Sequence, residues 1–410
     1  MKFKALAILL VSAATVLGSC RPSNTGGTSN APSSTNSTGE SSTATETTSS
    51  SSDTMLDPSR LPIAEIRVLS LACSSLVNEK GVGTSTQLVE FTGKLLARLD
   101  AITTQEGYGN RYKLLFVDST GYIYVKVDYA TYEALKNGIG STYRIIGNPS
   151  TYVGEAEVVL TSYQSASSVD VDLSALAESA DNIAAVHADA ARLGLNSKGV
   201  AFGRLVTFDA VCYGKADDSV LLFADGDNAI YVHGNQYIGN QFSKGNTYRL
   251  IAAITMFNFR PGVEFLAKSS IAAMEFELEP ELITANDLYD VKYEVDENAA
   301  YPEYSSKFTK LYSHIGYANY YYKDESRYII IEDAFNENSY STYQGARSAK
   351  AIFIKNEDCT GLYSDYEYGQ CPFSEYIDLE PIQITTIFMP YLWNSNDYWQ
   401  GYYLDVSIVE

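Results

Sequence analysis

Short runs in which apolar and polar residues alternate dominate the chain from about residue 88 onward. Examples are Tyr122–Val125 (YIYV) and Ala229–Val232 (AIYV), and Gly, Asn or Asp separates each run from the next. Alternation with period two places one face of a strand in a core, and many short strands with turn residues between them are typical of an all-β fold. The pattern therefore predicts a mainly β protein with short helices.

The strand pattern occurs twice. Ile123 and Ile230 are 230 − 123 = 107 residues apart, and Tyr143 and Tyr248 are 248 − 143 = 105 residues apart. Around them the two copies share a strand ending in Asp, an I-Y-V run and a G-x-x-Y-R run, namely Tyr112–Asp118, Gly121–Val125 and Gly140–Ile146 in the first copy and Val220–Asp225, Ala229–Val232 and Gly245–Ile251 in the second. Two copies of one module are therefore present.

A helix-like stretch precedes each copy. Ala64 to Asn78 precedes the first, and the Ala-rich stretch Leu173 to Leu195 precedes the second. Asp172 stands just before the second stretch, where its side chain can accept hydrogen bonds from the first free backbone N–H groups. We therefore expect each β module to carry a helix on its N-terminal side.

This order of elements resembles an OB-fold over roughly residues 88 to 162 and 199 to 270. The resemblance implies tandem OB-like five-stranded barrels, in which the face of strands 2 and 3 and the flanking loops bind oligonucleotides, oligosaccharides or proteins. A third, divergent β-domain is expected, because Lys307–Tyr312 (KFTKLY) and Tyr328–Asp333 (YIIIED) are similar to the first two strands of the module. The third copy lacks the I-Y-V run.

The N-terminus has the pattern of an export signal. Lys2 and Lys4 precede an apolar run from Ala5 to Leu17, which is long enough for a signal peptide but too short to span a bilayer. Leu17–Cys20 (LGSC) resembles a lipobox, which implies cleavage before Cys20 and lipidation of that cysteine. The alternative is an ordinary signal peptide in which Cys20 is incidental.

The next segment is almost entirely Ser, Thr, Gly, Asn and Pro, so it cannot bury enough side chain to order itself. A flexible tether of about 36 residues spans roughly 30 to 36 Å. The predicted domains are a signal peptide (1–19), a tether (20–57), OB-like domain 1 with its helix (58–165), OB-like domain 2 with its helix (166–280) and a Tyr-rich β-domain 3 (281–410).

Composition narrows the choice of partners. The chain has 29 Lys and Arg against 50 Asp and Glu, a net charge of −21, which repels phosphate backbones and makes a nucleic-acid partner unlikely. Tyrosine is abundant, with 33 residues against 2 Trp, as in a strand-rich protein or a contact surface. We therefore expect a glycan or an envelope protein as the partner.

Candidate ligand-binding residues follow from strand alternation. If Ile123 and Val125 face the barrel interior, Tyr122, Tyr124 and Lys126 lie on the outer face, and the same rule exposes Tyr231 and His233 in the second copy. Trp393 and Trp399, in the Tyr-rich last domain, are further candidates for sugar or protein contact. The alternative is that the tyrosines cover a neighbouring domain.

The four remaining cysteines permit three complete pairings, and Cys359 with Cys371 is the predicted disulfide because the two flank a loop between strand-like runs. Cys73 and Cys212 are expected as buried thiols. None of the cysteines has zinc-ligand spacing, so no metal and no cofactor are expected. The three histidines have no nucleophile at motif spacing, and no G-x-S-x-G, H-E-x-x-H or P-loop motif is present, although two distant carboxylates could still form a hydrolase.

These features predict a non-catalytic binding or adhesion module for glycan or protein, held by a lipid at the outer membrane or cell surface. A structural component of envelope assembly is the second hypothesis. A nucleic-acid-binding OB protein is the third, and it would require a positive groove.

Overall fold

The computed structural model describes residues 58–78, 82–101, 111–152, 154–193, 200–217, 220–226, 228–234, 238–257, 260–273, 280–293, 310–323, 326–338, 340, 343–355, 380–393, 396–402 and 406–409. All of them belong to the compact unit Met55–Glu410. Cys20, the signal-peptide and tether predictions, and the Cys359–Cys371 disulfide lie outside the described residues. The described helices include none long and apolar enough to cross a membrane.

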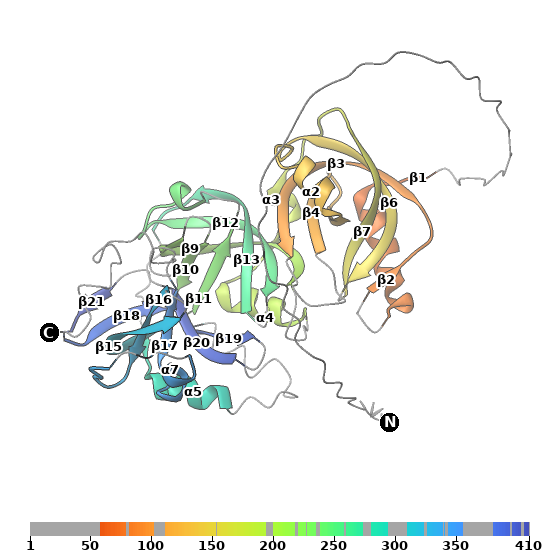
Figure 1. Ribbon diagram of the computed structural model, residues 1–410. Coiled ribbons are helices and arrows are strands. Elements are labelled where there is room, and N and C mark those ends of the chain that lie inside the picture. The colour runs from red at the N-terminus through yellow and green to blue at the C-terminus, as the bar shows by residue number, and fades with distance from the viewer. Residues whose placement is uncertain are drawn as a thin grey trace, which may run out of the picture. The chain divides into compact units, whose positions relative to one another are not determined.

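The first module is a closed five-stranded barrel (Figure 1). Antiparallel ladders join β3 (Val89–Ala101) to β4 (Arg111–Val117) and β4 to β5 (Tyr122–Val127), and β6 (Thr142–Tyr152) pairs with both β3 and β7 (Glu155–Ser165). The parallel pair β5–β7 completes the ring. The short helix α2 (Tyr129–Ala134) joins β5 to β6, and β2 (Val82–Thr84) adds to the edge of β6.

The second module repeats the same pairings with β9 (Val200–Asp217), β10 (Val220–Asp225), β11 (Asn228–His233), β12 (Thr247–Phe257) and β13 (Arg260–Ser270). Its parallel pair is β11–β13, and β9 pairs with β10 and β12. The 3₁₀ turn η2 (Ile238–Gln241) takes the place of α2. The predicted tandem OB-like barrels and mainly β fold class are confirmed.

The third module follows the same order of pairings in broken strands. β15 (Tyr312–Lys323), β16 (Ser326–Glu332) and β17 (Ile352–Lys355) correspond to strands 1 to 3, and β17 pairs in parallel with β20 (Asn396–Tyr402). The hairpin that supplies strands 4 and 5 is in pieces, with β18 (Ile382–Thr386) and β19 (Met389–Trp393) pairing with β21 (Val406–Ile408) and β20. Its sheet is not closed, so the predicted divergence is confirmed.

Each module begins with a two-residue strand followed by a helix. The pairs are β1 (Ser59–Arg60) and α1 (Ile63–Ala72), which continues into the 3₁₀ turn η1 (Cys73–Leu76), then β8 (Glu178–Ser179) and α4 (Ile183–Ala191), and β14 (Glu281–Leu282) and α5 (Ala285–Tyr293). Every short strand runs parallel to strand 1 of its own module. The predicted helix over residues 173 to 195 is corrected, because α3 (Leu173–Leu176) ends before β8. Asp172 does cap α3, accepting from Ser174 N at 2.9 Å.

An aspartate at the end of strand 2 joins each barrel to its helix. Asp118 accepts a hydrogen bond from Ile63 N at 2.9 Å, Asp225 accepts from Ile183 N at 2.5 Å, and Asp333 accepts from Ala285 N at 2.7 Å. The first backbone N–H groups of a helix lack partners within the helix, and a carboxylate there is favoured by the helix dipole. The aspartate at the end of strand 2 in each repeat therefore accepts hydrogen bonds at the N-terminus of the helix that precedes strand 1 of the same module.

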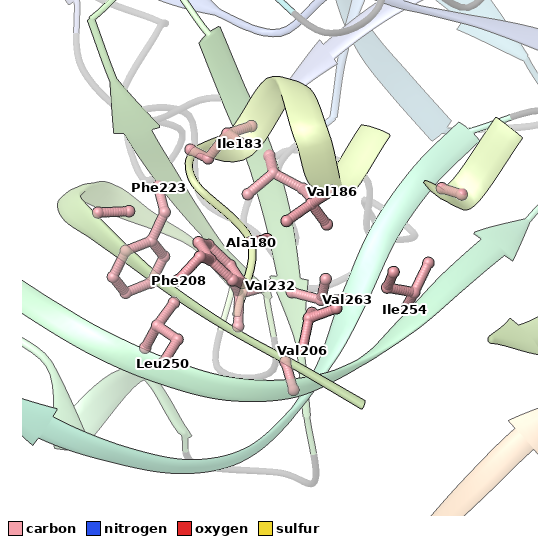
Figure 2. Close-up of a cluster of buried hydrophobic side chains, with 14 of the residues drawn as sticks. Ala180, Ile183, Val186, Val206, Phe208, Phe223, Val232, Leu250, Ile254 and Val263 are labelled. Carbon is pink, nitrogen blue, oxygen red and sulfur yellow. The ribbon is translucent and has the colours of Figure 1, made fainter. Parts of the chain in front are cut away.

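The helices close the barrel cores. In the second module Ile183, Val186 and Ala190 of α4 pack on strand residues such as Phe208, Phe223 and Val263 (Figure 2). In the first module Ile63 and Ile66 of α1 join the core of Phe91, Phe116 and Ile123. The i, i+3 and i, i+4 spacing of apolar residues on these helices matches this one-sided packing.

Candidate functional site

The outer face of strands 2 and 3 in the first module lies against the second module. Tyr124 is fully buried, and its hydroxyl donates a hydrogen bond to Gly203 O at 2.6 Å. Tyr122 is 8% exposed and lies under Arg67, whose guanidinium carbon is 4.0 Å from the ring centroid. Apolar residues of both modules complete the cluster, namely Ala97, Leu99, Leu115, Val117, Phe202, Leu205 and Ala253. This face is occupied by the protein itself.

The same face of the second module contacts the third. Tyr231 is 2% exposed, and its hydroxyl donates to Ile387 O at 3.0 Å and lies 3.3 Å from Thr386 Oγ1. Leu222, Ala224 and Ala229 pack with Leu311 and Ile387. Tyr124 and Tyr231 are equivalent residues, because they pair with Leu115 and Leu222 at the same position before the strand-2 aspartate. In each of the first two modules, one tyrosine therefore donates to a backbone carbonyl of the following module.

In the third module Phe353 takes the position of those tyrosines, opposite Ile330. Phe353 and Ile330 are covered by Ala346 of α7 (Tyr343–Ser348), by Ala351 and by the partly buried Tyr340. These covering residues come from the connection between β16 and β17. A buried hydroxyl needs a hydrogen-bond partner. Phenylalanine has no hydroxyl, which suits a position that is covered by the apolar side chains of Ala346 and Ala351.

A polar cluster stands beside this covering. Glu332, 6% exposed, accepts from Tyr340 Oη at 2.5 Å and from Asn319 Nδ2 at 2.8 Å. Asn319 Nδ2 also donates to Asn336 O and Asn338 O, each at 3.2 Å. Burial and the neighbouring Glu332 carboxylate raise the pKa of Tyr340 to about 12, so its hydroxyl remains a donor at neutral pH.

A buried ion pair lies in the outer face of the first module. Lys113 Nζ is 2.9 Å from Glu157 Oε2, and their side chains are 2% and 1% exposed. Aromatic rings surround the ammonium, with centroids at 4.8 Å for Tyr152, 5.7 Å for Tyr124 and 5.9 Å for Phe202. Ser150 Oγ donates to Glu157 Oε1 at 3.3 Å. Alternation in strand 2 could have placed Lys113 on this face, but the sequence does not show that Glu157 meets it.

The positions that receive a preceding module in the second and third modules are partly different in the first. Leu205 and Ala253 of the second module, and Leu311 and Ile387 of the third, receive the preceding module. By register the first module has Leu88 and Asn148 at these positions. Asn148 Nδ2 donates to Gln87 O on the surface at 3.1 Å. At one of these two positions the first module therefore carries a polar residue, Asn148, where the second and third modules carry Ala253 and Ile387.

Four ligand-binding candidates from the sequence remain, namely Lys126, His233, Trp393 and Trp399. Lys126 and His233 are half-buried and have interactions with other parts of the chain. Trp393 belongs to β19 and Trp399 to β20, and their side chains lie outside the described residues. Ligand binding by the five outer-face and two Trp candidates stays a prediction. For Tyr124 and Tyr231 it would require neighbouring modules to separate.

Two of the histidines and two of the cysteines are buried within the module cores or interfaces. His187 on α4 donates through Nε2 to Ala229 O at 2.8 Å, and burial lowers its pKa to about 4. Burial also lowers the pKa of His314, whose Nδ1 lies 2.9 Å from Ile283 O. Cys73 and Cys212 are buried free thiols, as expected. Within the described residues no cluster of three or more His, Cys, Asp or Glu could hold a metal ion.

We expect removal of the Tyr231 hydroxyl to weaken the contact between modules 2 and 3. Tyr231→Phe leaves the buried Ile387 carbonyl without this donor, which costs about 1–2 kcal/mol. Urea unfolding of the full chain, followed by hydrogen exchange of module-3 peptides, measures the loss. Tyr163→Phe, which removes the hydroxyl of a 37% exposed tyrosine, should change stability by less than about 0.5 kcal/mol. Equal stability of the two variants would contradict the assignment.

Comparison with known proteins gives likeness in structure alone. No protein-family model matches the chain, and no curated protein matches its sequence. The HINa domain of Ifi202, solved with a 20-base-pair double-stranded DNA, is 18% identical with a TM-score of 0.26, and the match covers 47% of this chain and 100% of that domain. The p202 HIN1 domain with a 12-mer double-stranded DNA is 16% identical with a TM-score of 0.26, covering 47% and 94%.

A replication protein A heterotrimer bound to single-stranded DNA is also similar, at 8% identity and a TM-score of 0.26, with 79% of this chain and 94% of that chain covered. Each of these neighbours was solved with DNA, so the prediction of a non-catalytic glycan- or protein-binding module, with nucleic acid as an unlikely partner, is corrected. At these identities the likeness itself concerns the fold.

Proposed function

We propose that the protein binds single-stranded nucleic acid through its third OB module. The observation that carries this proposal is a row of residues across four strands. Tyr321 on β15 pairs with Tyr328 on β16, and Lys355 on β17 pairs with Tyr402 on β20. Because Ile329 pairs with Ile354, the next position aligns Tyr328 with Lys355 and joins the two pairs into one row.

The row belongs to the part of an OB-fold that binds ligands. Strands 2 and 3 of an OB barrel form its usual ligand face, and in this chain the first two such faces are covered by the following module. Aromatic residues on such strands stack with bases, worth about 1–3 kcal/mol per base, and this stacking tolerates any sequence. Tyr328 and Lys355 stand on β16 and β17, the strands that correspond to that face.

The acidic composition of the chain predicts that binding depends only weakly on salt. With a net charge of −21, phosphate contacts cannot supply most of the affinity. One lysine in the row predicts a slope of about −0.7 for log K against log salt, the value for a single phosphate contact on a single strand. Binding dominated by stacking should therefore persist as salt increases.

Fluorescence anisotropy of the full chain with labelled 20-nucleotide oligo(dT) and oligo(dA) tests the proposal. Wild type should bind both, and Tyr321→Ala with Tyr328→Ala should weaken binding at least tenfold, because two stacking residues are lost. The matched control removes Tyr129 and Tyr163 of the first module, 59% and 37% exposed, and should bind like wild type. Equal binding by both double variants, or none by wild type, would exclude this function.

We also propose that the chain is exported and acylated on Cys20. Leu17–Cys20 (LGSC) after the apolar run supports it, as does the Ser/Thr-rich segment that follows. Expression in a bacterium fed labelled palmitate should label wild type and not Cys20→Ala. Ser19→Ala keeps the cysteine and places a more usual residue before it, so this variant should be labelled as well. An unlabelled wild type would contradict acylation.

A further inference from the structure

The connection between strands 2 and 3 is much longer in the third module than in the others. Residues 118–121 join β4 to β5, and residues 226–227 join β10 to β11. Between β16 and β17 the chain runs from 333 to 351 and includes α7. A turn of two to four residues is enough to connect these strands, so the extra length in the third module serves another purpose.

The described part of this connection, residues 333–338, 340 and 343–351, takes the place that a following module takes elsewhere. Ala346 and Ala351 are fully buried on Ile330 and Phe353. Ile330 and Phe353 stand at the positions of Leu115 and Tyr124, and of Leu222 and Tyr231, which the next module covers. The apolar face of the last module is thereby protected from water.

We propose that this connection, called the cap below, is a removable cover that competes with nucleic acid for the third module. The inference rests on the proposed function, because the row Tyr321, Tyr328, Lys355 and Tyr402 lies two residues along the strands from Ile330 and Phe353. A polynucleotide that extends along strands 2 and 3 meets the cap at that point. Ligand and cap cannot occupy Ile330 and Phe353 together.

The contacts of the cap suit a cover that opens. Its two ends are anchored separately, because Asp333 accepts from Ala285 N and Ala351 O accepts from Tyr289 Oη, each at 2.7 Å. Between these ends, the cap contacts the barrel through a small apolar cluster, through Tyr340 Oη on Glu332 and through Asn319 on the carbonyls of Asn336 and Asn338. Water can replace these hydrogen bonds when the cap leaves. Lys350 has φ of +56°, a left-handed conformation that glycine adopts without the Cβ penalty at the end of a helix. The closed cap therefore carries local backbone strain.

Two variants should shift the equilibrium between the closed and the open cap in opposite directions. Tyr340→Phe removes the donor to the buried Glu332 carboxylate in the closed state. Because this hydrogen bond is made to a charged group, its loss should raise the open population roughly tenfold or more. Lys350→Gly relieves the left-handed strain and should lower the open population about fivefold. Affinity for a ligand of the open state changes in proportion to that population.

Hydrogen exchange and oligo(dT) anisotropy on the full chain separate the two proposals. We expect peptides of 343–351 to exchange faster than those of β16, faster still in Tyr340→Phe and slower in Lys350→Gly, with oligo(dT) affinity following the same order. Tyr163→Phe is the control for loss of a tyrosine hydroxyl outside the cap. Cap peptides protected as strongly as β16 in all variants would overturn the cap. Exchange in the expected order without any oligonucleotide binding would retain a movable cap and exclude the proposed function.

Discussion

Lys113→Met should destabilise the protein by about 3–5 kcal/mol, the largest effect expected of a single substitution. The change removes the cation that lies 2.9 Å from Glu157 and leaves a carboxylate that is 1% exposed without its counter-charge. An isolated buried charge loses its hydration without compensation, so breaking such a pair costs more than the pair itself contributes. Urea unfolding of the full chain, monitored by circular dichroism, measures the loss.

The double variant Lys113→Met with Glu157→Leu distinguishes the contribution of the Lys113 charge to stability from that of its packing. Replacing both partners by apolar side chains of similar volume is often neutral or stabilising, so the double variant should recover most of the stability lost in Lys113→Met. A double variant as unstable as the single one would show that the contacts of Lys113 with Tyr152, Tyr124 and Phe202 matter more than its charge.

Stability should decrease as the pH falls from about 6.5 toward 4, and His187 should account for about 2 kcal/mol of the loss between pH 7 and pH 5. Burial lowers the pKa of His187 from 6.5 to about 4 in the folded protein. In this window the unfolded chain binds a proton that the folded chain does not, so acid favours unfolding. Above about pH 6.5 neither state is protonated and the contribution is complete.

The free energy of unfolding at pH 5, 6 and 7 tests this in wild type and in His187→Leu. The variant loses the hydrogen bond to Ala229 O at every pH. Between pH 7 and pH 5, however, its free energy of unfolding should fall by about 2 kcal/mol less than that of wild type. His314, whose pKa burial also lowers, remains in both proteins and cancels in the comparison. Parallel pH profiles would exclude His187 as the source.

Much of each module could be predicted from local pattern. Alternation at Ile123, Val125, Ile230 and Val232 placed these residues in the barrel cores, where all four are fully buried. The helix prediction over residues 173 to 195 was wrong in the middle, because β8 pairs with β9 there and a backbone ladder outweighs the helix propensity of an Ala-rich segment. Nothing local in Glu178 and Ser179 indicates that strand.

The repeat, the order of strands, the helix before the first barrel and the aspartate after strand 2 can be read from the sequence alone, because periodicity and turn residues act over a few positions. What covers the outer faces of the barrels depends on the packing of the modules against one another. Alternation showed that Tyr124 and Tyr231 point away from their own barrels, but Gly203 and Ile387, which accept their hydrogen bonds, lie 79 and 156 residues further along the chain. Burial depends on what packs against a face, and contacts at such separations leave no periodic signal in a single sequence.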